Sequence, residues 1–148
     1  MDAHSIVIEV FALPGEDVCQ IEAKLIDLFP FDLEEEEIPL HRKSAIGFNE
    51  QIIKTLRINL KKQRHIKAFL SHLLNQLSQE TKEQILYQAE QRLDQDLYFY
   101  LRFDKRELLQ HDQFLLINEG DCFYIKFKVA AFPKKKEKAL AIINKLLT

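Results

Sequence analysis

The chain has 148 residues, the length of one ordinary domain, and 47% of them are hydrophobic, so a full core can form without metals or disulfides. No basic segment followed by an apolar run opens the chain, and no apolar run approaches the ~20 residues that span a bilayer, which excludes a membrane-spanning class. The net charge is −2, but residues 1–50 hold 12 acids and 3 bases whereas residues 51–148 hold 11 acids and 18 bases. The basic C-terminal part favours nucleic acid or another anionic surface as a partner.

The two cysteines, Cys19 and Cys122, lie far apart, and neither belongs to a close pair of the kind that binds zinc. We therefore expect two buried free thiols in a reducing compartment. Together with the lack of a leader-like run, this predicts a soluble, cytoplasmic protein without a membrane partner. The sequence leaves the oligomeric state open.

Alternating apolar and polar side chains predict the first strand over residues 4–13. After a turn at residues 14–15, Glu16 and Asp17 open a helix, where acids complement the positive end of the helix dipole. This helix ends by Pro30, because proline cannot continue it.

Residues 34–37 form an acidic run, which we interpret as a solvated face rather than a metal site. A short strand over residues 38–44 and a clearer one over residues 50–61 follow, joined by a turn at residues 45–49. In the second strand, apolar side chains alternate with polar ones, which indicates one buried and one exposed face.

The middle of the chain begins with a strong helical pattern. Its apolar side chains recur at steps of three and four residues, as on the buried stripe of a helix: Ile66, Phe69, Leu70, Leu73, Leu74 and Leu77. Ser78 or Thr81 caps a second helix, so either an antiparallel pair or one bent helix is expected. Residues 96–103 then alternate as a strand, and Asp104 caps a short helical turn over residues 105–110.

The last third of the chain predicts a hairpin and a helix. A short strand over residues 113–117, a tight turn at residues 118–121 and a strand ending at Val129 form the hairpin. Pro133 suits the first turn of the final helix, where its missing N–H is not needed. The buried stripe of that helix is expected to hold Ala139, Ile142, Ile143, Leu146 and Leu147.

This order of elements predicts one α+β domain over residues 1–148. Strands joined by short turns favour an antiparallel sheet. Alternation on nearly every strand implies that helices cover one sheet face and leave the other partly wet, which gives a two-layer architecture.

The wet face of this sheet is expected to carry basic and aromatic side chains together. On the registers above they are Arg57, Tyr98, Tyr100, Arg102, Tyr124, Lys126 and Lys128. RNA-binding sheets use such faces, because rings stack on bases and cations contact phosphates. Tyrosine and lysine are also ordinary on exposed strands, so a protein-interaction or assembly module stays an alternative.

Three consecutive lysines, Lys134, Lys135 and Lys136, fall in the first turn of the last helix. This is a poor place for positive charge, since the N-terminal end of a helix favours acids. An external phosphate backbone would explain them.

The sequence shows no catalytic motif of the HExxH, CxxC or GxSxG type, and we expect no metal, no cofactor and no enzymatic activity. An enzyme would need a cleft that gathers His65, His72 or His111 with carboxylates. On a helix rich in apolar side chains, His65 and His72 are interpreted as surface or boundary residues.

Three segments resemble a known family. Residues 101–106 read LRFDKR and residues 129–140 read VAAFPKKKEKAL, which are similar to elements of an archaeal family of predicted exosome subunits described as RNA-binding. Residues 45–49, AIGFN, resemble a turn of the same family. Arg106 stands where that family commonly has glutamine.

The resemblance implies a fold like that of the ribosomal protein that binds 5S RNA, a curved antiparallel sheet with helices on one side. It also implies RNA as partner, with the exosome or ribosomal components. By position it indicates Lys105, Arg106 and residues 134–136 as the first site residues to test.

Overall fold

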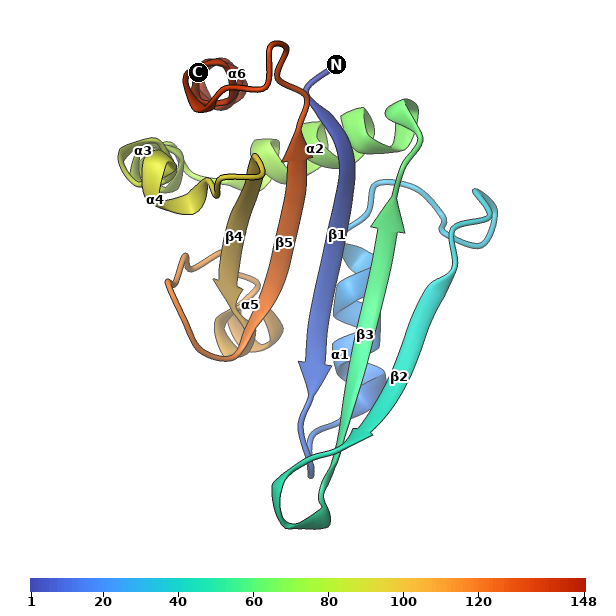
Figure 1. Cartoon of the computed structure of the whole chain (residues 1–148). Helices are drawn as coiled ribbons and strands as arrows, with labels where there is room; N and C mark the ends of the chain where they lie inside the picture. The colour runs from blue at the N-terminus through green and yellow to red at the C-terminus, as the bar shows by residue number, and fades with distance from the viewer. The chain divides into compact units, whose positions relative to one another are not determined.

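A five-stranded sheet in the order β2-β3-β1-β5-β4 is the centre of the fold (Figure 1). The computed structural model describes residues 1–148, apart from the side chain of residue 48. The strands are β1 (Ala3–Ala12), β2 (Leu40–Ile46), β3 (Ile52–Leu60), β4 (Tyr98–Asp104) and β5 (Cys122–Val129). The α-helices of the described part are α1 (Val18–Asp27), α2 (Gln63–Gln76), α3 (Gln79–Tyr87), α4 (Ala89–Arg92), α5 (Lys105–His111) and α6 (Lys136–Leu147). An antiparallel sheet with helices packed against it confirms the predicted α+β class.

The chain forms two compact units, and β1, β4 and β5 each contribute to both. The first unit comprises Met1–Ile6, Leu60–Leu101 and Ile125–Thr148. The second comprises Val7–Asn59 and Arg102–Tyr124. The expectation of a single domain over residues 1–148 stays a prediction.

Helices α2, α3, α4 and α6 belong to the first unit. The apolar stripe predicted for α2 is buried, including Ile66, Phe69 and Leu73. Ser78 caps α3 as predicted, since its side chain accepts a hydrogen bond from the Thr81 amide. Helix α6 packs against α3 and α4. The region predicted as a helical pair or one bent helix is thus three helical segments.

The second unit contains the β2–β3 hairpin, α1 and α5, together with the short 3₁₀ helix η1 (Phe48–Glu50). In the hairpin, Leu40 lies opposite Ile58 and Ile46 opposite Ile52. Asp17 caps α1 and Asp104 caps α5, each by accepting backbone N–H groups. The Asp104 cap agrees with the prediction, and α5 packs against α1.

Several details of the prediction are wrong. Residues 113–117 do not form a hairpin with β5, because Leu116 bridges Phe103 and the Ile117 amide bonds the Arg102 carbonyl, both in β4. Helix α6 begins at Lys136 instead of Pro133, since the chain turns first and the Lys135 amide bonds the Pro133 carbonyl at 2.8 Å.

Two expectations about side-chain burial also fail. His65 is buried, not a surface or boundary residue, because it lies on the packed side of α2 beside Ile66. Cys19 is exposed near the start of α1, whereas Cys122 is half-buried; both are free thiols.

Candidate nucleic-acid interface

Strict alternation along β4 and β5 separates a buried apolar face from a half-buried polar one. In β4 of the first unit, Phe99 is buried and packs with its ring centroid 5.3 Å from that of Phe127 in β5. The intervening side chains point to the other face, as expected for a strand. We call this set in the first unit the lysine–tyrosine surface: Tyr98, Tyr100, Lys126 and Lys128.

The two lysines of this surface lie over tyrosine rings. The ammonium nitrogens of Lys126 and Lys128 are 4.3 Å and 4.6 Å from the centroid of the Tyr98 ring. Lys126 is also 5.9 Å from the centroid of the Tyr100 ring. These are cation–π distances, and the attraction gathers two positive charges at one ring. Their geometry confirms the prediction that these four residues share a face. Contact of this face with RNA stays a prediction.

Tyr100 is fixed in orientation by Asp94. Its hydroxyl donates a hydrogen bond of 2.6 Å to the Asp94 carboxylate, which also accepts from the Tyr98 and Asp96 amides. Partial burial raises the pKa of Asp94, but these hydrogen bonds and the charge of Lys126 outweigh it and lower the pKa below its ordinary value. The carboxylate therefore stays ionised and holds the tyrosine in place.

The lysine turn, which we define as residues 132–136, links β5 to α6 within the first unit. All five residues are exposed, and the Phe132 side chain is 93% exposed. Lys135 occupies the N-cap position of α6 and makes no side-chain capping hydrogen bond. The predicted lysine cluster thus lies at the surface, just before and at the beginning of the helix.

In the second unit, Arg102 and Tyr124 form a further cation–π pair. The guanidinium carbon of Arg102 is 5.1 Å from the centroid of the Tyr124 ring. Both are half-buried, in line with the prediction that they share the wet face of the sheet.

Arg57 lies in a groove of the second unit with a volume of about 440 Å³. The groove is lined by Glu9, Phe11, His41, Lys43, Thr55, Arg57 and Asn59. Arg57 forms an ion pair of 2.5 Å with Glu9. The sequence pattern indicated Arg57 but not Glu9 and Phe11. Their alternation with buried Ile8 and Val10 along β1 is the signal that places them on this face.

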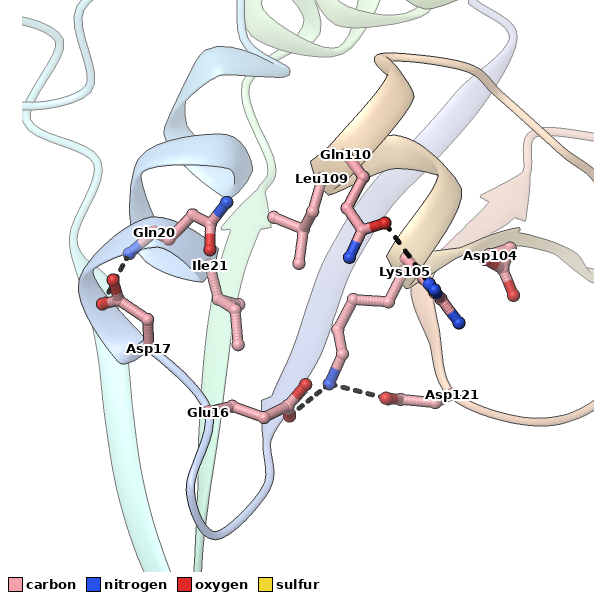
Figure 2. A pocket seen from close by; sticks show the side chains of 10 residues that line it. Glu16, Asp17, Gln20, Ile21, Asp104, Lys105, Leu109, Gln110 and Asp121 are labelled. Atoms are coloured by element: carbon pink, nitrogen blue, oxygen red, sulfur yellow. Dashed lines mark hydrogen bonds and ion pairs between the residues drawn. The ribbon is translucent and has the colours of Figure 1, made fainter.

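Lys105 is buried in a pocket of about 420 Å³ between α1 and α5 of the second unit (Figure 2). Its ammonium donates to Glu16 at 2.6 Å, to Asp121 at 2.6 Å and to the Phe11 carbonyl at 3.0 Å. A lysine ammonium has three donors, so all of them are used. The structure thus gives Lys105 an internal role; a contact with RNA stays a prediction.

Arg106 follows Lys105 on α5 but faces solvent. Its guanidinium donates to the side-chain oxygen of Gln110 at 3.3 Å, which lies one helical turn further along. Because Gln110 is neutral, the positive charge of Arg106 is not cancelled by this partner. The two neighbouring residues that the resemblance indicated therefore occupy different environments.

Neither a metal centre nor a membrane span is found in the described part of the chain. No group of three or more His, Cys, Asp or Glu side chains there could hold a metal ion. None of the helices there combines the length and the apolar character that crossing a membrane requires.

Comparison with known proteins shows which family the chain is similar to. A family model described as RNA binding matches residues 5–130. The chain belongs to this RNA-binding family. A curated relative, RNA-binding protein PAB1135 of Pyrococcus abyssi (strain GE5 / Orsay), is 29% identical over 148 residues, which cover 99% of this chain and 95% of that protein. The family is described by RNA binding and not by a catalysed reaction.

Solved structures of the same family share the fold. Protein AF2318 from Archaeglobus fulgidus, a DUF54 protein, is 25% identical with a TM-score of 0.84, over 97% of this chain and 99% of that one. Mth689, a DUF54 protein from Methanothermobacter thermautotrophicus, is 24% identical with a TM-score of 0.78 over the whole of both chains. The narrower expectations of an exosome subunit and of a fold like the 5S-RNA-binding ribosomal protein stay predictions.

Proposed function

We propose that this protein binds RNA without catalysis, through the lysine–tyrosine surface and the lysine turn of the first unit. One observation carries the proposal. The five lysines of these two features form no ion pair within the described part of the chain: Lys126, Lys128, Lys134, Lys135 and Lys136. None of their ammonium groups is held there by a carboxylate at ion-pair distance, so each can turn to an external anion.

Several basic residues of the second unit form ion pairs instead. Lys24 pairs with Asp27 and Asp112, Arg42 pairs with Glu22, and Lys105 pairs with Glu16 and Asp121. A basic side chain that is already paired gains less binding free energy from a phosphate, because its ion pair must first be broken. Among the described residues, the five lysines have no ion pair to give up, and they lie beside tyrosine rings or together in one exposed turn, which favours this surface for a polyanion.

In the proposed complex, phosphates contact the lysine ammonium groups and bases contact the tyrosines. A phosphate that arrives near Tyr98 draws Lys126 and Lys128 from the ring. The ring face is then open for an unpaired base, and Tyr100 stays in position because Asp94 holds its hydroxyl. In the second unit, Arg57, Arg102, Arg106 and Tyr124 extend the proposal, with Lys105 as an internal support.

The resemblance noted in the sequence extends the proposal to a cellular role. We propose a single-domain, cytoplasmic accessory factor of the RNA exosome or of ribosomal RNA metabolism. Co-purification of exosome or ribosomal components with the tagged chain, in an RNase-sensitive manner, would support this role. Co-purification of neither would leave RNA binding as the proposed activity alone.

Fluorescence anisotropy with labelled RNA tests the proposal. The variant Lys134→Ala/Lys135→Ala/Lys136→Ala is expected to bind roughly tenfold more weakly than the wild type, since each exposed contact contributes about 0.5 kcal/mol. A matched control, Lys54→Ala/Lys61→Ala/Lys67→Ala, changes the net charge equally at other exposed lysines. Equal losses in the two variants would contradict a site at the lysine turn. Absence of RNA binding would favour the protein-interaction alternative.

A further inference from the structure

Phe132 stands out among the exposed side chains of the first unit. Its side chain is 93% exposed, and three lysines follow it within four residues. Isolated exposed apolar side chains are common in proteins and need no explanation. An exposed aromatic ring directly beside three uncompensated positive charges is a different case, because its surroundings select an anionic partner.

The backbone around Phe132 is anchored on both sides, so the exposure of the ring does not come from a loose chain end. Before it, the Val129 amide bonds the Leu97 carbonyl at 2.9 Å and the Ala130 amide bonds the Asp2 carbonyl at 3.0 Å. Ala131 itself is buried. After it, Ala139 is fully buried within α6. The fold holds the Phe132 ring out in solvent.

The spacing along the chain suits one nucleotide and its flanking phosphates. Phe132 and Lys136 are four residues apart, so their Cα atoms are separated by at most about 14 Å. The lysine side chains therefore start close enough to the ring to reach a phosphate next to a base that lies on it. Aromatic rings beside cations bind single strands in this way, because every base has a face that can stack.

From these observations we propose that Phe132 is a stacking platform for an unpaired base, and that the RNA bound here is single-stranded. The inference rests on the proposed function and adds the class of RNA and one new binding residue. In a duplex the bases are stacked on one another and their faces are closed to the ring, so a duplex leaves Phe132 unused.

The chain contains no tryptophan, which allows a direct optical test. Phe132→Trp keeps an aromatic platform and introduces one fluorophore. Titration with a ten-nucleotide oligoadenylate should quench its emission saturably, whereas an RNA duplex of equal length should not. Tyr87→Trp is the matched control: Tyr87 is 91% exposed at the end of α3, and no lysine or arginine lies within four residues of it, so its replacement should report no quenching.

Phe132→Ala supplies the energetic test. Its affinity for the oligoadenylate should fall by roughly fivefold to a hundredfold, while its affinity for the duplex stays unchanged. Unchanged emission of Phe132→Trp at saturating RNA, or wild-type affinity of Phe132→Ala, would overturn the inference. The proposed function would survive that result if the lysine variant still lost affinity.

Two other outcomes would show that Phe132 contacts protein instead of RNA, or that the chain does not bind RNA. If Phe132→Ala changes only the oligomeric state in light scattering, the ring contacts protein and the inference is overturned. If the wild type binds neither RNA, the proposed function fails, and the stacking role fails with it.

Discussion

Lys105 combines deep burial with a full positive charge, and this is tolerated because every donor of its ammonium has an oxygen partner. Glu16 precedes α1, Asp121 precedes β5, and Phe11 contributes its backbone carbonyl from β1. A buried charge without partners would cost several kcal/mol, whereas a compensated one can fix the relative positions of the groups that surround it. The residue thus acts by positioning three segments of the second unit.

Glu16 makes this arrangement sensitive to pH. Partial burial raises the pKa of its carboxyl, but hydrogen bonds from Lys105 and the Leu13 amide, with the charge of Lys105, lower it below the ordinary 4.5. A carboxyl with a lowered pKa in the folded state contributes stability above its unfolded pKa. This stability is lost as pH falls through the folded pKa.

We therefore expect Glu16→Gln to flatten the pH dependence of stability. Between pH 6 and pH 3, the free energy of unfolding of the wild type should fall more steeply than that of the variant, with the difference appearing below about pH 4.5. Urea denaturation at each pH measures this. Glu83→Gln, at an exposed position on α3, should keep the wild-type slope. Parallel curves for Glu16→Gln and the wild type would show that the ion pair does not contribute.

At the level of elements, capping residues set where the helices of the second unit begin. The Asp104 carboxylate accepts the Glu107 amide at 2.9 Å and so begins α5, which carries Lys105 and Arg106. The cap satisfies one of the N–H groups that a helix N-terminus leaves without an internal partner.

Asp104→Ala is expected to destabilise the protein by about 1 kcal/mol, since an alanine cannot accept this hydrogen bond. Thermal or urea unfolding measures the loss. Asp104→Asn keeps a capping oxygen and should retain nearly all of the stability. An equal loss in both variants would mean that the charge of Asp104, rather than its cap, supports α5.

Local patterns predict these elements well where one face is buried. The alternation of apolar and polar residues in β4 and β5 is enough to predict that Tyr98, Tyr100, Lys126 and Lys128 share a face, as they do. The pairing of residues 113–117 could not be predicted in this way, because a short strand can bond to either neighbour. Whether residues 113–117 bond to β4 or to β5 depends on the tertiary fold, which the alternation of apolar and polar residues does not specify.

For the whole molecule, the sequence predicted the α+β class and the basic C-terminal part, but not how its charges are compensated. Arg57 and Lys105 look like Lys126 and Lys134 in sequence, yet the first two pair with carboxylates far away along the chain. Ion pairs between distant residues follow from the fold alone. Which basic side chains form an ion pair, and which do not, is therefore what the structure adds to the sequence.

The salt dependence of RNA binding tests the central claim most directly. If the lysine–tyrosine surface and the lysine turn contact phosphates, the logarithm of the affinity should fall linearly with the logarithm of salt concentration. Each contact with a single strand contributes a slope of about −0.7, so five lysines give at most about −3.5. Replacing all five with alanine should make the slope shallower by up to about 3.5, and the arginines of the proposed site account for what remains. A variant slope equal to that of the wild type would contradict the account, as would a wild-type affinity that does not change with salt.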